Sequence, residues 1–312
     1  MPLGAVHPNK AASCRSWPTR KDAPHRPNRK NFPRRHGRSG TAPSSPKLMK
    51  GTNPMRPEHG FLPTTIARTI LSRMQIVHDT QRIAIFSGPP GIGKTTAINE
   101  FVSANPGEAE VVTIKKENAS SRIVIQYALE AVRRLTDNID GHVYTDTYLI
   151  GRQFRKEVAK LADYNGFDRE AMRLTLIFDE AQTLTKTAIE ELRHWNDAAD
   201  NDLPFKIGLI FVGNEEFSLK SSGSGQSVIS AAVSDRARFI ESFSYSDLTD
   251  GDLAAFIHAH GIDDAEAVSA IVRRFSGPRA VRSFRRVADL IEDLAMVANG
   301  EPVTAEIVKS II

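Results

Sequence analysis

The stretch Ile85–Ile98, IFSGPPGIGKTTAI, decides the fold of this 312-residue chain. It begins with a short apolar run and then places five glycines and prolines among the six residues from Gly88 to Gly93. Such a cluster interrupts regular structure. Residues 82–87 predict a short buried strand before the cluster, and apolar residues recur at helical spacing after it. The sequence therefore predicts a specialised loop between a strand and a helix.

Residues 88–95 of this loop fit the pattern G-x-x-x-x-G-K-[ST] without a mismatch. Backbone N–H groups in such a loop form a concave anion site, and side chains larger than glycine would block it. Lys94 can reach the β- and γ-phosphates of a nucleotide, and the Thr95 hydroxyl is placed to bind Mg²⁺. The following helix adds the positive end of its dipole. We therefore expect a site for ATP and Mg²⁺ formed by Gly88, Pro89, Pro90, Gly91, Ile92, Gly93, Lys94, Thr95 and Thr96.

Polar residues follow two further predicted strands. Asp179 and Glu180 end the apolar run 174–178, and Asn214 follows the run 207–212. Ligands of open α/β sheets bind outside the carboxyl ends of the strands, so Asp179 is expected to bind Mg²⁺. Glu180 is expected to polarise a water for attack on the γ-phosphate, and Asn214 to hydrogen-bond that water or the phosphate. The alternatives are an acidic surface junction and an ordinary asparagine turn.

Charge is divided unevenly along the chain. Residues 1–58 carry 13 Lys and Arg against 2 Asp and Glu, a net charge of +11, so the remainder has +4 − 11 = −7. The first segment is rich in Pro, Arg and Ser, which predicts a disordered basic tail. It is either an arm that binds nucleic acid non-specifically, or solubilising disorder, or a segment partly untranslated because synthesis begins at Met49 or Met55.

Several classes of protein are excluded by composition. The single cysteine, Cys14, allows no disulfide within one chain. No apolar run reaches the roughly 18 residues of a membrane span, and the N-terminus lacks the apolar core of a secretory signal. The histidines lack metal-ligand spacing, so Mg²⁺ is the one metal expected. A cytoplasmic protein without a membrane partner is the resulting expectation.

The order of predicted elements indicates an α/β fold. Strands alternate with helices, which implies a mostly parallel five-stranded sheet covered on both faces. The predicted strands are residues 82–87, 111–114, 174–178, 207–212 and 239–243. Residues 221–227 are expected to form a flexible loop, and Thr187 with Glu190 a helix capping box. Strand signals stop beyond Asp247, which predicts a tail over 1–58, an ATPase domain over 59–247 and a small helical domain over 248–312.

These motifs occur in the order found in AAA+ ATPases. The Walker A, Walker B and sensor 1 motifs of that superfamily resemble residues 88–95, the Asp-Glu-Ala-Gln segment 179–182 and the segment that ends at Asn214. Its arginine finger and sensor 2 resemble segments 235–238 and 276–279. The Asp-Glu-Ala-Gln form is most similar to the MuB- and TnsC-type ATPases that select targets for DNA transposons. The resemblance covers about residues 60–290.

The resemblance implies a catalytic cycle shared between subunits. Arg236, with Arg238 as the alternative, would reach a neighbouring subunit's site, and Arg279 would sense the γ-phosphate. The family hydrolyses ATP to ADP and phosphate as homo-oligomers on double-stranded DNA, and a transposase is a further expected partner. Lys115 and Lys116 are candidate DNA contacts, although a solvated lysine pair explains them as well. The sequence lacks a clear helix-turn-helix, which puts sequence-specific DNA recognition in doubt.

Two other functions fit the same motifs. An ATPase of this fold could serve replication initiation, helicase loading or a secretion assembly like that of ExeA. Alternatively, the chain could be a nucleotide-gated scaffold with negligible hydrolysis. Trp195, at core spacing, is expected to pack in the interior rather than to stack on a base.

Overall fold

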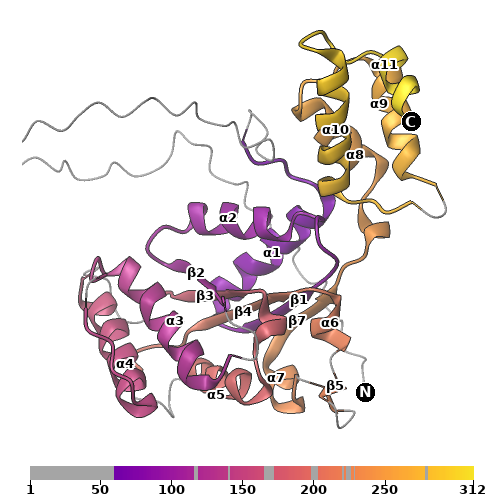
Figure 1. Cartoon of the computed structure of the whole chain (residues 1–312). Helices are drawn as coiled ribbons and strands as arrows, with labels where there is room; N and C mark the ends of the chain where they lie inside the picture. Colours follow the sequence, from indigo (N-terminus) through magenta and orange to yellow (C-terminus); the bar gives the residue numbers. More distant parts are fainter. Residues whose placement is uncertain are drawn as a thin grey trace, which may run out of the picture. The chain divides into compact units, whose positions relative to one another are not determined.

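Five apolar runs form one sheet in the computed structural model, and their bounds are β1 (Ile83–Ser87), β2 (Ala109–Thr113), β3 (Thr175–Asp179), β4 (Gly208–Gly213) and β7 (Ala237–Ser242). The strand order is β2-β3-β4-β1-β7, and every neighbouring pair is parallel (Figure 1). The predicted five-stranded parallel sheet is confirmed, with bounds shifted by one or two residues. Since all strands run the same way, the segments after β1, β3 and β4 leave the sheet at one edge, called here the carboxyl edge.

The structure describes residues 60–312 with several gaps. The residues in that range that it does not describe are 116–118, 140, 165–171, 198–202, 220, 223–225, 228 and 278–279. The predicted basic tail, residues 1–58, lies outside the described residues. The described residues form one compact unit.

Helices connect and cover the strands. Their bounds are α1 (Thr65–Thr80), α2 (Lys94–Ala104), α3 (Ser121–Leu135), α4 (Thr147–Tyr164), α5 (Lys186–Asn196), α6 (Glu215–Leu219), α7 (Ala231–Arg236), α8 (Asp250–Ala259), α9 (Ala265–Phe275), α10 (Phe284–Ala298) and α11 (Ala305–Ile311). Two short 3₁₀ turns, η1 (Ala181–Thr183) and η3 (Tyr245–Asp247), follow β3 and β7. None of the helices in the described ranges has both the length and the apolar composition needed to cross a membrane.

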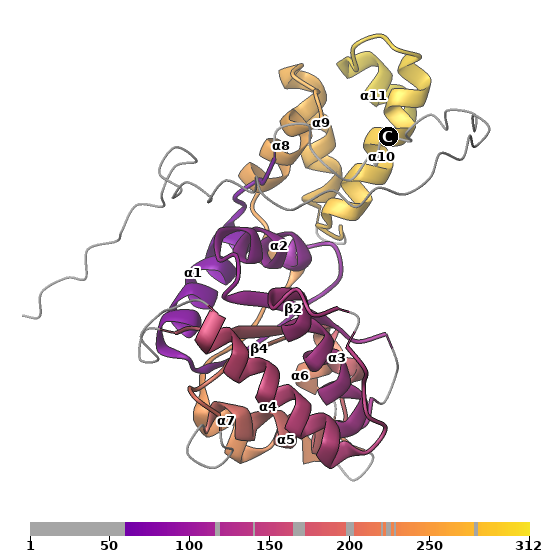
Figure 2. The same cartoon turned by 90° about the vertical axis from the view of Figure 1, so that its left-hand side faces the viewer.

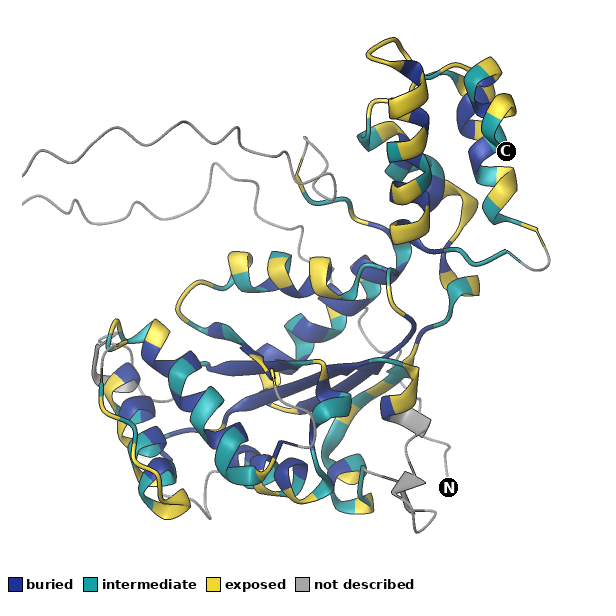
Figure 3. Cartoon of the chain, viewed as in Figure 1, coloured by how far each residue is buried: buried dark blue, intermediate teal, exposed yellow. Residues whose placement is uncertain are grey.

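The sheet separates two apolar cores. Side chains of a strand point alternately to its two faces. In β1, Ile83 and Ile85 belong to the core shared with α3, α4 and α5, whereas Ala84 and Phe86 belong to the core shared with α1 and α2. Figures 1 and 2 show these two groups of helices on opposite sides of the sheet, and Figure 3 shows the central strands β1, β3 and β4 as almost wholly buried. A near-continuous apolar strand is therefore explained by burial on both faces.

Two local predictions are wrong. The cap of α5 is Thr185, whose side chain accepts a hydrogen bond from the Ala188 amide, and not Thr187. The helix therefore begins two residues earlier, and Thr185 Oγ1 also donates a 3.3 Å hydrogen bond to the Ala119 carbonyl oxygen. The predicted loop over 221–227 contains two antiparallel two-residue strands, β5 (Ser221–Ser222) and β6 (Gln226–Ser227). Serine-rich sequence carries no apolar alternation that would have indicated this pairing.

Helices α8–α11 follow the sheet, as the loss of strand signals predicts. They extend the core of α1 and α2 through Leu253, Ile271 and Val287. Thr249 and Asp252 form a capping box at the start of α8. Asp252 also accepts a 2.8 Å hydrogen bond from the Thr65 amide, so one carboxylate joins the first turns of α1 and α8. Burial opposes its ionisation, but the hydrogen bonds from Thr249 and Thr65 together lower the pKa of Asp252.

Candidate nucleotide site

The loop between β1 and α2 has the backbone shape that its glycines predict. Gly91 and Gly93 have φ angles of +78° and +97°, in the left-handed region that glycine adopts without strain. Gly93 is the N-terminal cap of α2. A Cβ on Gly91 would lie 2.3 Å from Ser283 Oγ and 3.2 Å from Arg285 Cβ. The glycines therefore let the backbone of this loop take its shape at the start of α2, where an anion site needs backbone N–H groups that no side chain covers.

Lys94 is the first residue of α2 and its side chain turns back over the loop. Its Nζ donates hydrogen bonds of 2.7 and 2.8 Å to the carbonyl oxygens of Gly88 and Pro89. Burial lowers the pKa of Lys94, while the charges of Asp179 and Glu180 oppose that shift. The ammonium group thus lies between the loop and the carboxylates that follow β3.

Asp179, the last residue of β3, contacts residues 88–95, called here the phosphate loop. Thr95 Oγ1 donates a 3.3 Å hydrogen bond to Asp179 Oδ2 across 84 residues of sequence. Burial raises the pKa of Asp179, and the Glu180 charge adds to the rise. The hydrogen bonds from the Glu180 amide and from Thr95 act in the opposite direction. A hydroxyl and a carboxylate oxygen in contact are a suitable pair of oxygen ligands for Mg²⁺.

Glu180 is exposed at the carboxyl edge and has a left-handed backbone, with φ of 57°. Its carboxylate accepts a hydrogen bond from Gln182 Nε2, and Gln182 Oε1 accepts one from the Asn214 amide at 3.1 Å. The fourth residue of the Asp-Glu-Ala-Gln motif therefore bridges the ends of β3 and β4. The sequence does not predict this role of Gln182, since its contact with Asn214 spans 32 residues.

Asn214 lies directly after β4, as predicted. Its side-chain Oδ1 is buried, and it has no hydrogen-bond partner among the described residues. A buried polar atom is normally paired, so an unpaired one points to a ligand or water at that position. This orphaned oxygen, together with the glycine-shaped loop, indicates that the carboxyl edge fits a nucleotide.

The two candidate finger arginines lie at the amino ends of the strands, opposite to the carboxyl edge. Arg236 ends α7, immediately before the amino end of β7, and its Nε donates to both carboxylate oxygens of Asp197 at 3.0 and 3.1 Å. The hydrogen bond to Asp197 raises the pKa of Arg236. Arg238 is exposed, with its guanidinium carbon 5.9 Å from the Phe239 ring centre. A five-residue strand is about 15 Å long, so neither arginine is positioned at its own phosphate loop.

Helix α10 brings a different arginine to the loop. Arg279, the predicted phosphate sensor, lies outside the described residues. Arg285, in the first turn of α10, lies beside Gly91, and the neighbouring Phe284 amide donates a 2.8 Å hydrogen bond to the Gly91 carbonyl. Tyr245 contributes a second contact, from its hydroxyl to the Pro90 carbonyl at 3.3 Å. Sequence reasoning missed Arg285 because nothing local indicates which end of α10 meets the loop.

The remaining predicted residues fall into two groups. Lys115 is exposed after β2 at the carboxyl edge, and Lys116 lies outside the described residues. Trp195 is buried and stacks on Phe154 with ring centres 4.0 Å apart, which confirms that it packs in the interior. Among the described residues, no group of three or more His, Cys, Asp or Glu side chains forms a metal cluster.

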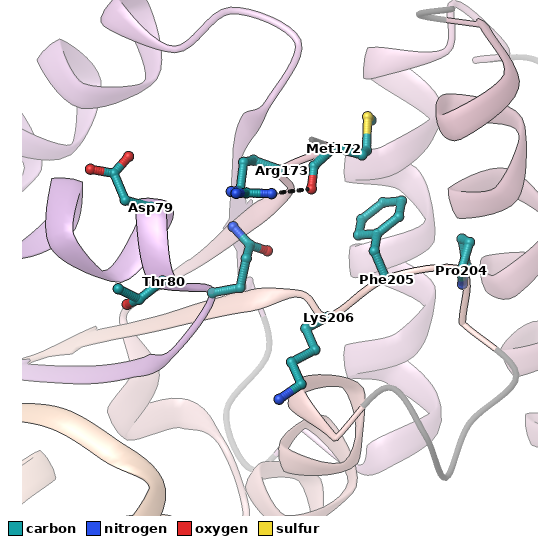
Figure 4. A pocket seen from close by; sticks show the side chains of 8 residues that line it. Asp79, Thr80, Met172, Arg173, Pro204, Phe205 and Lys206 are labelled. Atoms are coloured by element: carbon teal, nitrogen blue, oxygen red, sulfur yellow. Dashed lines mark hydrogen bonds between the residues drawn. The ribbon is translucent and has the colours of Figure 1, made fainter. Parts of the chain in front are cut away.

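A cavity of about 390 Å³ lies at the amino ends of the strands, away from the phosphate loop. Asp79, Arg173 and Lys206 are among its lining residues (Figure 4). The Arg173 guanidinium donates to the Met172 carbonyl at 3.1 Å. This cavity shares no residue with the site at the carboxyl edge.

Similarity to known proteins agrees with this geometry. Residues 77–220 match the family model of the AAA domain. The chain is 28% identical over 163 residues to the Mu-like prophage FluMu DNA transposition protein B of Haemophilus influenzae. That match covers 52% of this chain and 48% of the relative, so it spans about half the length of each.

A solved structure shares the fold at low identity. Cdc6p from Pyrobaculum aerophilum matches 80% of this chain and 65% of its own, with a TM-score of 0.54 and 14% sequence identity. At this identity the likeness shows a shared fold and no shared function. Residues 77–220 thus match the AAA domain, and the chain has the fold of the AAA+ ATPases, with a likeness to a Mu-like transposition protein B.

Proposed function

We propose that this protein binds Mg·ATP at the carboxyl edge of its sheet and hydrolyses it to ADP and phosphate. The hydrogen bond between Thr95 and Asp179 is the observation that carries the proposal. It joins the phosphate loop to the strand-end carboxylate, although the two residues are far apart in sequence. In this proposal residues 59–247 act as the ATPase domain and residues 248–312 as its lid.

Each side chain of the site has a role in binding. The loop amides and the Lys94 ammonium would hold the β- and γ-phosphates, and Thr95 with Asp179 would hold Mg²⁺. Bound Mg²⁺ would supply positive charge between the phosphates. Arg285, and Arg279 as predicted from sequence, would contact the γ-phosphate from the lid, since a guanidinium can bind two phosphate oxygens at once.

Hydrolysis would depend on the residues that follow β3 and β4. Glu180 would accept a proton from the attacking water, and Asn214 would orient that water through its unpaired Oδ1. Gln182 would hold the Glu180 carboxylate at a fixed place relative to Asn214. Arg236 lies too far from its own loop, so its contribution requires a second subunit whose loop faces it, and Arg238 stays the alternative.

The biological role is proposed from the relative. The matched protein is named a DNA transposition protein B, so we infer that this chain is a transposition accessory protein that oligomerises on double-stranded DNA without sequence preference. A transposase is its expected partner, and a cytoplasmic location follows from that role. Lys115 is the described residue proposed to contact DNA near the ATP site.

The variant Glu180→Gln tests the proposal because glutamine keeps the shape of glutamate and cannot act as a base. ATP should still bind, while DNA-stimulated phosphate release should fall by about 10²–10⁴-fold. Glu216→Gln, an exposed residue of α6, is the matched control and should retain wild-type rates. Loss of ATP binding in Glu180→Gln would show that Glu180 is structural, and unchanged phosphate release would remove it from the mechanism.

A further inference from the structure

One side of α4 carries a line of exposed side chains that the ATP site does not use. Tyr148, Arg152, Lys156 and Lys160 follow one another at intervals of four residues and are all exposed. Residues four apart lie on the same side of a helix, one turn above the other. The opposite side of α4 is buried through Ile150, Phe154, Val158 and Leu161. Figure 2 faces α4, which lies on the outside of α3.

The charge of this surface is opposite to that of the body of the protein. Residues 147–160 contain four cationic side chains, including Arg155, and one carboxylate, a net charge of 4 − 1 = +3. Residues 59–312 as a whole carry −7. Glu157, the single carboxylate, is 5% exposed and accepts hydrogen bonds from Asn138 and Lys160. Most of the cationic charge along α4 therefore faces solvent.

The cations at the centre of this surface are available for a partner. Within the described part of the chain, no salt bridge involves Arg152, Arg155 or Lys156. An isolated solvated helix face normally mixes charges of both signs. A line of cations without carboxylates, on an acidic protein body, is instead the pattern expected of a surface that binds a polyanion.

Two aromatic side chains lie beside these cations, one just before α4 and one in its first turn. Tyr144 and Tyr148 are 45% and 68% exposed. The Tyr144 amide donates to Gln153 Oε1 at 3.2 Å, and Arg122 donates to the Thr145 carbonyl at 2.9 Å. These hydrogen bonds connect residues 144–145 to α4 and α3. The backbone that carries the two tyrosines is therefore held in place by its neighbours.

We propose that this surface, the α4 ridge (Tyr148, Arg152, Arg155 and Lys156), binds the phosphate backbone of duplex DNA. The inference rests on the DNA-binding part of the proposed function and adds a contact surface separate from the ATP site. The eight residue steps from Tyr148 to Lys156 rise about 12 Å, which spans about three phosphates of one strand at about 3.4 Å of duplex axis each. Arginine and lysine bind phosphates by charge, and the tyrosine hydroxyls can donate to phosphate oxygens.

The test measures how the DNA affinity of the full chain depends on KCl concentration, with ATP and Mg²⁺ present. Arg152→Ala/Lys156→Ala should make the slope of log K against log salt shallower by about 1.8, since each lost phosphate contact contributes about 0.9. Affinity at 0.1 M salt should fall at least about tenfold. Circular dichroism and phosphate release without DNA should not change, because both side chains are exposed and remote from the phosphate loop.

Two controls separate the ridge from diffuse attraction. Arg152→Lys/Lys156→Arg keeps both charges in place and should retain the wild-type slope. Arg273→Ala/Arg274→Ala removes two exposed charges from the last turn of α9 and should change the slope less. An unchanged slope in the ridge variant, an equal change in the α9 variant, or an effect confined to single-stranded DNA would each overturn the assignment. Wild-type protein that binds no DNA would instead refute the proposed function itself.

Discussion

The Oε1 atom of Gln182 accepts a 3.1 Å hydrogen bond from the backbone amide of Asn214. A backbone N–H can only donate, so this contact fixes which end of the Gln182 amide is oxygen and turns Nε2 toward Glu180. Nε2 donates to the Glu180 carboxylate. One side chain therefore sets the position of the proposed base relative to the residue proposed to orient the water.

Gln182→Ala should lower kcat for ATP hydrolysis and leave KM nearly unchanged. Its described hydrogen bonds join Glu180 and Asn214, and a misplacement of about 1 Å in a reacting group can reduce the rate about 10²-fold. Steady-state phosphate release across ATP concentrations checks this split. Gln126→Ala is the matched control, since Gln126 makes a 3.1 Å bond to Glu130 on α3, away from the site. A higher KM with normal kcat would assign Gln182 to ATP binding instead.

Lys94→Ala should weaken ATP binding without unfolding the protein. The described hydrogen bonds of Lys94 Nζ are to the carbonyls of Gly88 and Pro89, within the loop itself. Calorimetry should show at least a tenfold loss of affinity, about 1.4 kcal/mol, with normal circular dichroism. Lys309→Ala, on α11, removes an exposed lysine elsewhere and should bind ATP normally. Wild-type affinity in Lys94→Ala would disprove the phosphate site.

Asp179→Asn should stabilise the nucleotide-free protein at neutral pH while weakening Mg·ATP binding. Burial raises the pKa of Asp179, so its ionised form makes the folded state less stable relative to the unfolded state. Asparagine removes that charge and keeps an oxygen that accepts from Thr95. The gain in Tm should be present above the raised pKa and should vanish as the pH falls below 3.8, where both states of the wild type are protonated. Thermal melts at several pH values check this, and a gain that persists at low pH would contradict it.

Local signals explain why the sheet and the phosphate loop could be predicted. Gly91, Gly93 and Lys94 belong to one short pattern, and the buried strand before Asp179 is a continuous apolar run. The missed features depend on contacts between distant segments. Arg285 reaches Gly91 only through the packing of α10 on the loop, and Gln182 meets Asn214 only because β3 and β4 are neighbours. No local pattern encodes either contact.

The position of Arg236 agrees with the proposal that ATP sites are completed between subunits. Its Nε is held by Asp197, and Arg193 donates to the same carboxylate at 3.1 Å. This ion pair holds the guanidinium at the end of α7. It lies at the amino ends of the strands, whereas the phosphate loop of the same chain lies at their carboxyl ends. Arg238, two residues later, is exposed on β7 and is the competing candidate.

Mixing two inactive variants distinguishes these candidates. An Arg236→Ala subunit keeps its own phosphate loop and lacks only what it gives to a neighbour, whereas a Lys94→Ala subunit has the opposite defect. Each variant alone should be nearly inactive, because an arginine supplied in trans is worth about 10³–10⁵ in rate. Mixed oligomers should regain part of the activity, since some interfaces pair an intact loop with an intact arginine. DNA-stimulated phosphate release across mixing ratios, repeated with Arg238→Ala, measures this. Activity that never exceeds the sum of the separate variants would argue against a shared site, and rescue by Arg238→Ala beside a fully active Arg236→Ala would assign the finger to Arg238.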